Sequence, residues 1–596
     1  MLFEALIVFS LCLGLGTLAA IVPGLRRARF FLSLPCVAVA LAAAGLIAEL
    51  VLRDPTGCVV LCLVVLVVML AVRVANPRWS WVGALLFAAV LLASLAYLVY
   101  AAYQTYARGL GAGIMAASSL LLLLEIAALA LSVSYAFEVV DVVSRRERTP
   151  ARPPVTRQPW VALQVATYNE PVEIVQPTLE SLARLDYPHL IVQVVDNNTK
   201  DPELWQPLRD LCERLGPRFH FMHLDPWPGF KAGACNEATR RLPAEVEIVG
   251  VVDADYRVEP DFLTAMVGHF DDPQVAFAQS SQNYRDWSDN RYLRGLFYSF
   301  RYFFDLSMPS RAHRNAIIFC GTMGLIRRSA LQEVGGWNEE CITEDAEASL
   351  RILGHGYRGV YDRAAYGAGI MPLDFDGLKK QRFRWALGGV QILRLWWREL
   401  LPFGQHELRL TRRQRMHYLL GALQWFGEPL TAAFTALLLL TALMTALHHQ
   451  LPLRQLTGAV LVVPLAFAAT GLLRATWAMR QTTRCTWQDA WQALRVWFAL
   501  SWVVTLACLR GLVSRQAEFL RTPKKKESSA LWTALLSARA EILIALAAAA
   551  GGVAMVVRSP ALATGILGAL LLLEAFIYFC APLASVAAER VTETPE

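Results

Sequence analysis

Long apolar runs flank one extended stretch of soluble character along the chain. Runs long enough to cross a bilayer occupy about residues 2–23, 30–52, 57–75, 79–102 and 112–141, and later about 416–446, 457–479, 539–557 and 561–582. A helix that crosses the hydrocarbon core needs about 20 predominantly apolar residues. The pattern therefore predicts five spans, a soluble domain and then a second bundle of four spans.

Arginines orient these predicted spans in a membrane. They follow the first span (Arg26, Arg27, Arg29), flank the end of the third (Arg73, Arg78) and follow the fifth (Arg145, Arg146, Arg148), whereas the other two loops hold only Arg53 and Arg108. Positively charged loops stay on the cytoplasmic side. We therefore expect an external N-terminus and a cytoplasmic soluble domain.

A further apolar stretch at about 496–514 is ambiguous. If it crossed the membrane, the basic segment 519–526 that follows would face outward, against the charge rule. We therefore predict that residues 486–514 form a helix pair at the cytoplasmic interface. Within the spans, Glu125 is expected to face the bundle interior, because ionisable side chains in membranes rarely face lipid.

Strand-length apolar runs alternate with helical segments inside the soluble domain. The strand candidates are Val161–Thr167, Leu190–Asp196, Phe219–Leu224 and Val246–Asp253, and the helical segments between them include 171–185, 203–216 and 231–242. This alternation predicts a parallel sheet with right-handed crossovers. Ligands of such sheets bind beyond the carboxyl ends of the strands, where Thr167, Asn169, Asp196, Asp253 and Asp255 fall.

Composition agrees with a membrane protein. Apolar residues make up 56% of the 596 and charged residues 18%, against a globular norm of about 25% charged. A purely soluble, disordered or nucleic-acid-binding chain is therefore excluded. The eleven cysteines show no CxxC spacing or Cys/His cluster, so neither a zinc site nor a disulfide framework is predicted.

Acidic residues at three places carry candidate chemistry. Asp253 and Asp255 follow a buried strand, where two carboxylates suit a hard divalent ion shared with phosphates. Asp196 either reaches a base or ribose, or caps the turn that follows it. Asp345 precedes the amphipathic helix 346–354 with Thr343 as a plausible N-cap, so a purely capping role also stays open.

Gln381-Arg382-Phe383-Arg384-Trp385 is a fourth candidate element. Its arginines suit a diphosphate, and its tryptophan suits stacking on a sugar ring. The alternative is an amphipathic interfacial helix whose Arg and Trp face lipid headgroups.

Seven short blocks follow one another in order between the two apolar bundles. They are Thr167-x-Asn169-Glu170, Asp196, Lys231-Ala232-Gly233, Asp253-x-Asp255, Cys320-Gly321-Thr322, Thr343-Glu344-Asp345 and Gln381-x-x-Arg384-Trp385. This order resembles the membrane-embedded family-2 glycosyltransferases, which include cellulose synthase, hyaluronan synthase and related β-glucan synthases. The resemblance implies an α/β nucleotide-sugar-binding domain, Rossmann-like with a parallel sheet, at residues 144–410, between transmembrane α-helical bundles at 1–143 and 411–596.

The resemblance also implies roles for individual residues. Asp345 would be the general base, and Asp255 would bind Mg²⁺ or Mn²⁺. The donor nucleotide would be bound by Thr167, Asn169, Glu170, Asp196, Lys231 and Asp253. The acceptor and pyrophosphate would be held by Gln381, Arg382, Arg384, Trp385, Glu344, Cys320 and Gly321. Phe519, Thr522 and Lys524 look like a gating loop within residues 486–527.

The activity implied is that of an inverting β-glycosyltransferase that polymerises sugar from a UDP-sugar, foremost UDP-glucose into β-glucan, and passes the polymer across a bacterial cytoplasmic membrane. Many family members have Asp-Asp-Gly where this chain has Asp196-Asn197-Asn198, which looks more like β-(1→3)-glucan or cyclic-glucan synthases. The implied partners are a nucleotide-sugar donor, a growing polysaccharide, membrane lipids and accessory export subunits, with no nucleic acid. The alternative is a non-processive transferase with a lipid acceptor.

Overall fold

The computed structural model describes residues 2–26, 30–145, 152–448, 453–454, 463–514, 531–558 and 561–591. The chain forms two compact units. A helical unit comprises residues 1–149, 426–502 and 538–583, and a second unit comprises residues 150–425, 503–537 and 584–596. The predicted soluble domain therefore forms the main part of the second unit, and sequence from both sides of it builds the first.

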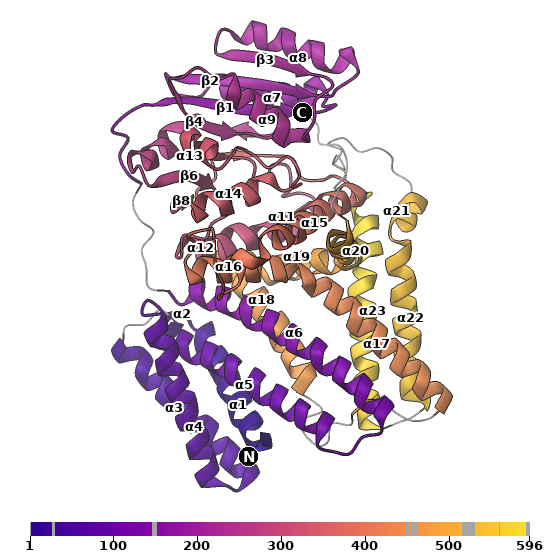
Figure 1. The fold of residues 1–596 in the computed structure, drawn as a ribbon. Helices are drawn as coiled ribbons and strands as arrows, with labels where there is room; N and C mark the ends of the chain where they lie inside the picture. The colour runs from indigo at the N-terminus through magenta and orange to yellow at the C-terminus, as the bar shows by residue number, and fades with distance from the viewer. Residues whose placement is uncertain are drawn as a thin grey trace. The chain divides into compact units, whose positions relative to one another are not determined.

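Long apolar helices make up the helical unit (Figure 1). They are α1 (Leu2–Ile21), α3 (Phe30–Leu52), α4 (Pro55–Ala75), α5 (Trp81–Tyr106), α6 (Ala112–Val143), α17 (Gly427–His448), α18 (Val463–Thr483), α19 (Trp487–Ala499), α22 (Arg539–Arg558) and α23 (Leu562–Ala588), with the short α2 (Pro23–Arg26). Local caps set their starts: Asp54 accepts the Gly57 N–H before α4, and Ser80 accepts the Gly83 N–H before α5.

Eight helices in the described part of the chain are long and apolar enough to cross a membrane. They account for eight of the nine predicted spans, with α17 joined to the preceding helix in one span. The ninth corresponds to α18, and its predicted residues 457–462 lie outside the described residues. The stretch at 486–514 forms two helices, α19 and α20 (Ser501–Val513), bent by 45°. The predicted helix pair is thus confirmed, and its place at an interface stays a prediction.

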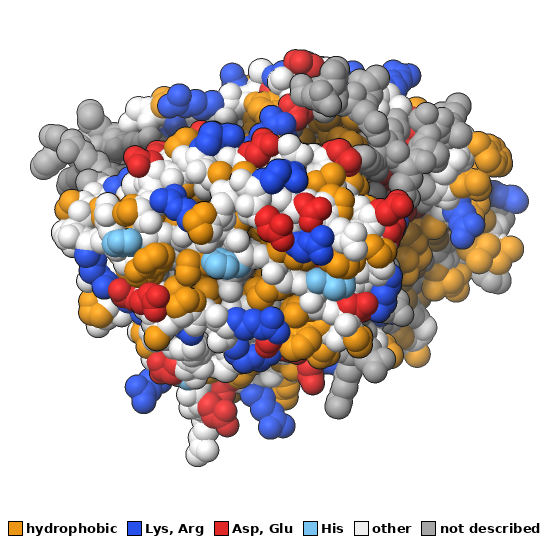
Figure 2. All heavy atoms as spheres, turned by 90° about the horizontal axis from the view of Figure 1, so that it is seen from above, with side chains coloured by type: hydrophobic (Ala, Val, Ile, Leu, Met, Phe, Trp, Pro, Cys, Tyr) orange, Lys and Arg blue, Asp and Glu red, His pale blue; other side chains and the backbone are white. Residues whose placement is uncertain are grey.

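The surface of α4 is more apolar than the surface of a helix in an ordinary soluble bundle. Val59, Leu63, Val67, Leu70 and Val74 are all exposed along this helix. Contiguous apolar surface of this kind marks contact with another apolar phase. Acidic and basic side chains are instead interspersed over the face seen in Figure 2.

Glu125 faces the interior of the helical unit, as predicted. Its carboxylate accepts a hydrogen bond from the Tyr97 hydroxyl at 2.7 Å and forms an ion pair with Arg454. Arg454 also donates to Thr105 Oγ1 and the Ser118 carbonyl, both at 3.1 Å. Arg454 is therefore held between α5 and α6 by a buried charged pair.

A seven-stranded sheet forms the centre of the second unit, in the order β3-β2-β1-β4-β7-β6-β8. The strands are β1 (Trp160–Thr167), β2 (Leu190–Asn197), β3 (Phe219–Leu224), β4 (Val246–Val251), β6 (Val275–Ser280), β7 (Gly324–Arg327) and β8 (Arg358–Asp362), while β5 (Arg257–Val258) and β9 (Gly367–Ala368) pair separately. All four predicted strands are confirmed, and they pair in parallel.

The strand β7, which the sequence did not predict, departs from the parallel direction of the other strands. This strand pairs antiparallel with β4 and β6, and its first residue, Gly324, lies opposite Val251 at the end of β4. The reason is that β7 starts at the edge where the parallel strands end and so runs back across the sheet. The fold is a mixed, mostly parallel α/β sheet.

Helices cover both faces of this sheet (Figure 1). Besides α20, the helices of the second unit are α7 (Val172–Ala183), α8 (Pro202–Leu215), α9 (Phe230–Arg240), α10 (Phe262–Met266), α11 (Arg291–Tyr302), α12 (Met308–Ala312), α13 (Arg328–Glu333), α14 (Glu344–Gly354), α15 (Phe375–Leu400), α16 (Arg412–Leu423) and α21 (Leu531–Ser537). One apolar core joins Leu163 to Leu179, and another joins Val249 to Leu350. Burial on both faces explains why the parallel strands read as continuous apolar runs.

Candidate active site

The carboxyl ends of three parallel strands bring the predicted acidic residues to one edge. Thr167 at the end of β1 lies opposite Asp196 on β2, and Asp253 follows the end of β4 by two residues. Parallel neighbours necessarily end on the same side of a sheet. The predicted placement of these residues is confirmed.

Asp196 is almost fully buried and holds the β1–β2–β3 edge together. Its Oδ1 accepts hydrogen bonds from Thr167 Oγ1 at 3.1 Å and from Thr199 Oγ1 at 2.7 Å, and its Oδ2 lies 2.8 Å from His223 Nδ1. The bond to Thr199 confirms the turn-stabilising role that the sequence left open. Contact of Asp196 with a nucleotide stays a prediction.

Two residues beside Asp196, His223 and Trp205, were not anticipated. His223 lies opposite Asp196 in the register of β2 and β3, and its ring stacks on Trp205 with centroids 4.4 Å apart. The strand prediction for β3 already contained the signal for His223, since parallel pairing of β2 with β3 places Asp196 and His223 side by side.

The predicted residues Asn169 and Glu170 lie on the loop after β1. Asn169 adopts a φ of 51° and donates its N–H to Thr199 Oγ1 at 2.9 Å, and Glu170 follows it on the same loop.

Lys231 connects the end of β4 to the loop before β7. It is the second residue of α9, and its Nζ donates to Asp253 Oδ1 at 2.7 Å and to the Gly321 carbonyl at 3.0 Å. Burial disfavours the charged form of Lys231, but the Asp253 and Glu344 carboxylates outweigh it and raise its pKa. A fixed ammonium group therefore lies between the strand end and the start of α14.

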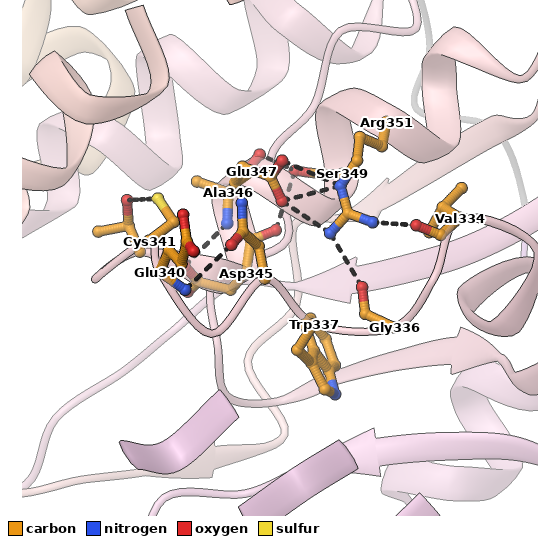
Figure 3. Close-up of polar contacts among 12 residues, drawn as sticks. Val334, Gly336, Trp337, Glu340, Cys341, Asp345, Ala346, Glu347, Ser349 and Arg351 are labelled. Atoms are coloured by element: carbon orange, nitrogen blue, oxygen red, sulfur yellow. Dashed lines mark hydrogen bonds and ion pairs between the residues drawn. The ribbon is translucent and has the colours of Figure 1, made fainter. Parts of the chain in front are cut away.

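Glu344 and Asp345 form a partly buried acidic pair in the first turn of α14. Burial raises the pKa of both carboxyl groups; the neighbouring Asp345 raises that of Glu344 further, while Lys231 lowers both. Asp345 Oδ1 accepts the Ala346 N–H at 2.8 Å, as Figure 3 shows. Thr343 occupies the N-cap position but makes no side-chain cap bond in the described part of the chain. The first turn of α14, which contains Asp345, therefore receives no capping hydrogen bond from the Thr343 side chain.

Gly321 lies directly against Asp345. Its φ is +69°, and a Cβ there would lie 2.6 Å from Asp345 Oδ2. The adjacent Cys320 donates its N–H to Gln279 Oε1 at 2.8 Å. Burial, reinforced by the Asp345 charge, raises the pKa of the Cys320 thiol, which keeps the thiol neutral beside the acidic pair.

The two arginines of the Gln381–Trp385 block have different surroundings. Burial lowers the pKa of Arg384, while Asp253 and Glu344 act in the opposite direction, so its guanidinium interacts with the acidic cluster. Arg382 instead packs over Phe300 and Trp385, at 4.7 and 4.8 Å from the ring centroids. Gln381 Oε1 is buried and accepts no hydrogen bond from the described residues.

Asp253 and Asp255 carry the carboxylates that the sequence predicted to hold a divalent ion. Asp255 is buried, and its Oδ2 accepts the Ile370 N–H at 2.9 Å. No group of three or more His, Cys, Asp or Glu ligands gathers among the described residues. Mg²⁺ is commonly bound by one or two carboxylates together with substrate phosphates, so this pair fits an ion that enters with a diphosphate.

Two further predictions concern the gating-loop residues and the cysteines. Phe519, Thr522 and Lys524 lie outside the described residues. All eleven cysteines are free thiols in the structure.

Comparison with known proteins adds an independent result. The family model for glycosyl transferase family group 2 matches residues 248–550, about half of the chain. The chain is 29% identical over 244 residues to glucomannan 4-beta-mannosyltransferase 7 of Arabidopsis thaliana, covering 40% of this chain and 44% of that protein. It is 28% identical over 312 residues to the cellulose synthase catalytic subunit (UDP-forming) of Xanthomonas axonopodis pv. citri (strain 306), covering 50% of this chain and 40% of that one.

The chain therefore spans less than half the length of these curated relatives. Among solved structures, it is similar to a mannosyltransferase from Pyrobaculum calidifontis in complex with GDP-Man and Mn²⁺. That similarity has 21% identity and a TM-score of 0.45, over 65% of this chain and 99% of the other.

Proposed function

Because the chain belongs to glycosyl transferase family group 2, we propose that it is an inverting β-glycosyltransferase that builds a polysaccharide from a nucleotide sugar. The observation that carries the proposal is the convergence of Asp253, Lys231, Gly321 and the Glu344–Asp345 pair at one edge of the sheet. The names of the relatives, a cellulose synthase and a glucomannan mannosyltransferase, support a β-linked hexose polymer.

In this proposal Asp345 is the general base. It takes the proton of an acceptor hydroxyl while the hydroxyl oxygen attacks the anomeric carbon of the donor. The new C–O bond forms on the face opposite the bond that breaks to the diphosphate, so an α-linked donor yields a β-linkage. One base behind the acceptor suffices for this displacement. The position of Asp345 against Gly321, where partial burial raises the pKa of its carboxyl group, suits it to hold that proton.

The donor diphosphate is proposed to lie beside Asp253 and Asp255. Mg²⁺ or Mn²⁺, when bound there, supplies the positive charge that stabilises the leaving diphosphate. Arg384 adds a second positive charge close to Asp253. Lys231 balances the Asp253 carboxylate and so orients it. Thr167, Asn169, Glu170 and Asp196 would border the nucleotide on the β1–β2 side.

The acceptor sugar is proposed to lie against Trp385, with Gln381 as a hydrogen-bonding partner. Trp385 and Phe300 pack with ring centroids 5.7 Å apart, and Arg382 lies over both rings. An aromatic surface of this kind suits the apolar face of a pyranose. Cys320 and Gly321 would form the neighbouring wall.

We further propose that residues 1–143 and 411–596 form the membrane bundles on either side of a cytoplasmic transferase domain at 144–410. The polymer would leave outward through a bacterial cytoplasmic membrane, and Phe519, Thr522 and Lys524 would close over the diphosphate. The long apolar helices support a membrane location. UDP-glucose is the donor that we propose first, with β-glucan as product.

Membrane vesicles that contain the full chain test this function. They are incubated with labelled UDP-glucose, UDP-N-acetylglucosamine or GDP-mannose, with Mg²⁺ or Mn²⁺ present. We expect one donor to label a polymer, and we expect Asp345→Asn to lower the rate by about 10²- to 10⁴-fold, as loss of a general base does. Asp210→Asn, at an exposed carboxylate on α8, is the matched control. A wild-type chain that labels nothing would contradict the proposal, and a single sugar on lipid would favour the lipid-acceptor alternative.

A further inference from the structure

One buried carboxylate, that of Glu347, receives hydrogen bonds from two directions. Glu347 lies two residues after Asp345 on α14 and is fully buried. Its oxygens accept bonds from Arg351 Nε at 2.9 Å and Nη2 at 2.7 Å, and Oε1 also accepts the Trp396 indole N–H at 3.0 Å. Figure 3 shows the Arg351 side chain reaching Glu347 from the next turn of the same helix.

Arg351 fastens a third segment to this carboxylate. It donates to the Gly336 carbonyl at 2.9 Å and also to the Val334 carbonyl, both in the turn after α13. Figure 3 shows both carbonyl oxygens pointing toward the guanidinium group. A buried ion pair is retained at least cost when further hydrogen bonds satisfy its remaining atoms. The start of α14 and the turn at 334–336 are therefore fixed to each other.

Trp396 brings α15 into the same network. It lies eleven residues after Trp385, about three helical turns, so both side chains share one face of α15. Gln391 Oε1 also accepts the Ile342 N–H at 3.1 Å. At Gly388, a Cβ would lie 2.3 Å from Thr343 Oγ1. Three positions of α15, at Gly388, Gln391 and Trp396, thus contact the segment from Ile342 to Glu347, which contains Asp345.

A cleft of about 630 Å³ borders this network. Its lining includes Glu347, Arg351 and Trp396, together with Asn236 and Trp337. Trp396 is only partly buried, so packing does not enclose its ring on all sides. The hydrogen bond to Glu347 therefore contributes to fixing the indole, and with it the face of α15.

From these contacts we infer that Glu347, Arg351 and Trp396 are positioning residues that set the distance between the base Asp345 on α14 and the acceptor-binding block Gln381–Trp385 on α15. The inference rests on the proposed function, since it assigns no new reaction. None of the three residues is placed at the reacting atoms. Their effect reaches the chemistry through the helices that carry Asp345 and Trp385.

Trp396→Phe is the most direct test, because it keeps an aromatic ring and removes the N–H donor. We expect kcat to fall by about 10- to 100-fold, the range that a misplacement near 1 Å produces. The KM for UDP-glucose or GDP-mannose should stay within about two-fold, because donor-side contacts are untouched. Trp396→His keeps a ring N–H and should recover part of kcat.

Trp397→Phe is the matched control, since Trp397 is the exposed neighbour on the same helix. It should leave kcat, KM and the melting temperature unchanged. Glu347→Gln is the second variant. It removes the counter-charge of the partly buried Arg351, so we expect a lower melting temperature of the purified full chain.

The outcomes separate the inference from the proposed function. Wild-type transfer, loss of transfer in Asp345→Asn and a selective fall of kcat in Trp396→Phe support both. Wild-type transfer with an unchanged kcat in Trp396→Phe overturns the inference alone, as does a loss in which KM and melting temperature change in step with kcat. Absence of wild-type transfer from all tested donors overturns the proposed function, and the inference with it.

Discussion

Gly321 touches the proposed base through its backbone, in a conformation that side chains rarely adopt. Its φ is +69°, and the added methyl group of Gly321→Ala would lie 2.6 Å from Asp345 Oδ2. The substitution therefore combines backbone strain with displacement of the carboxylate. We expect it to destabilise the fold by about 1–2 kcal/mol and to lower kcat by at least about ten-fold. Thermal melting and transfer assays measure the two effects.

Gly216→Ala separates strain from displacement. Gly216 also has a positive φ, +101°, but a Cβ there meets none of the described atoms within 4 Å. This variant should lose comparable stability and keep full activity. Equal activity in the Gly321 and Gly216 variants would contradict the close approach of Gly321 to the base.

Titration of Asp345 gives a second prediction at this scale. Burial raises the pKa of its carboxyl group, and Lys231 lowers it. A base is active when deprotonated, so kcat/KM should fall on acidification through a pH above about 3.9, the ordinary value for aspartate. Replacing Lys231 by Gln removes the opposing charge. The acidic limb of the pH profile of kcat/KM should then move to still higher pH. A limb at the ordinary aspartate value, or a downward shift in Lys231→Gln, would count against Asp345 as the base.

At the scale of helices, the ion pair between Arg454 and Glu125 joins a loop to α5 and α6. Its side chains are 1% and 12% exposed. Removing one partner of a buried pair leaves an uncompensated charge and costs about 3–5 kcal/mol. Arg454→Leu should therefore lower the melting temperature of the full chain strongly. Arg454→Leu combined with Glu125→Leu should be closer to the wild type, and additive losses would contradict direct pairing.

Strands and helices of the second unit could be predicted where the pattern is local. The strands β1 to β4 agree with the predicted runs because parallel strands buried on both faces are continuously apolar. The antiparallel direction of β7 could not be predicted, since it depends on where the chain re-enters the sheet after the helical insertion that includes α11 and α12.

The contacts of the candidate site also fall into two groups: local ones, which the sequence predicts, and contacts between distant segments, which it does not. Asp253 follows directly from the strand that precedes it, and the sequence alone located it. The contacts of Lys231 with Gly321 and of Trp396 with Glu347 join segments that are distant along the chain. No periodicity encodes such pairs, because they arise only when the sheet and its helices pack.

At the scale of the whole molecule, apolar helices from both sides of the transferase domain in sequence belong to one helical unit. The proposal that the polymer leaves through these bundles depends on product being made on one side of the membrane and recovered on the other. Inside-out vesicles expose the proposed cytoplasmic face to added donor, and sealed right-side-out vesicles do not.

The most direct measurement supplies labelled UDP-glucose to sealed inside-out vesicles of wild type and Asp345→Asn, and follows the label into polymer inside and outside the vesicles. Digestion of the product with β- and α-specific glucosidases then reads its configuration. We predict a β-linked polymer enclosed by wild-type vesicles and almost none from Asp345→Asn. An α-linked product, or equal synthesis by wild type and Asp345→Asn, would contradict it.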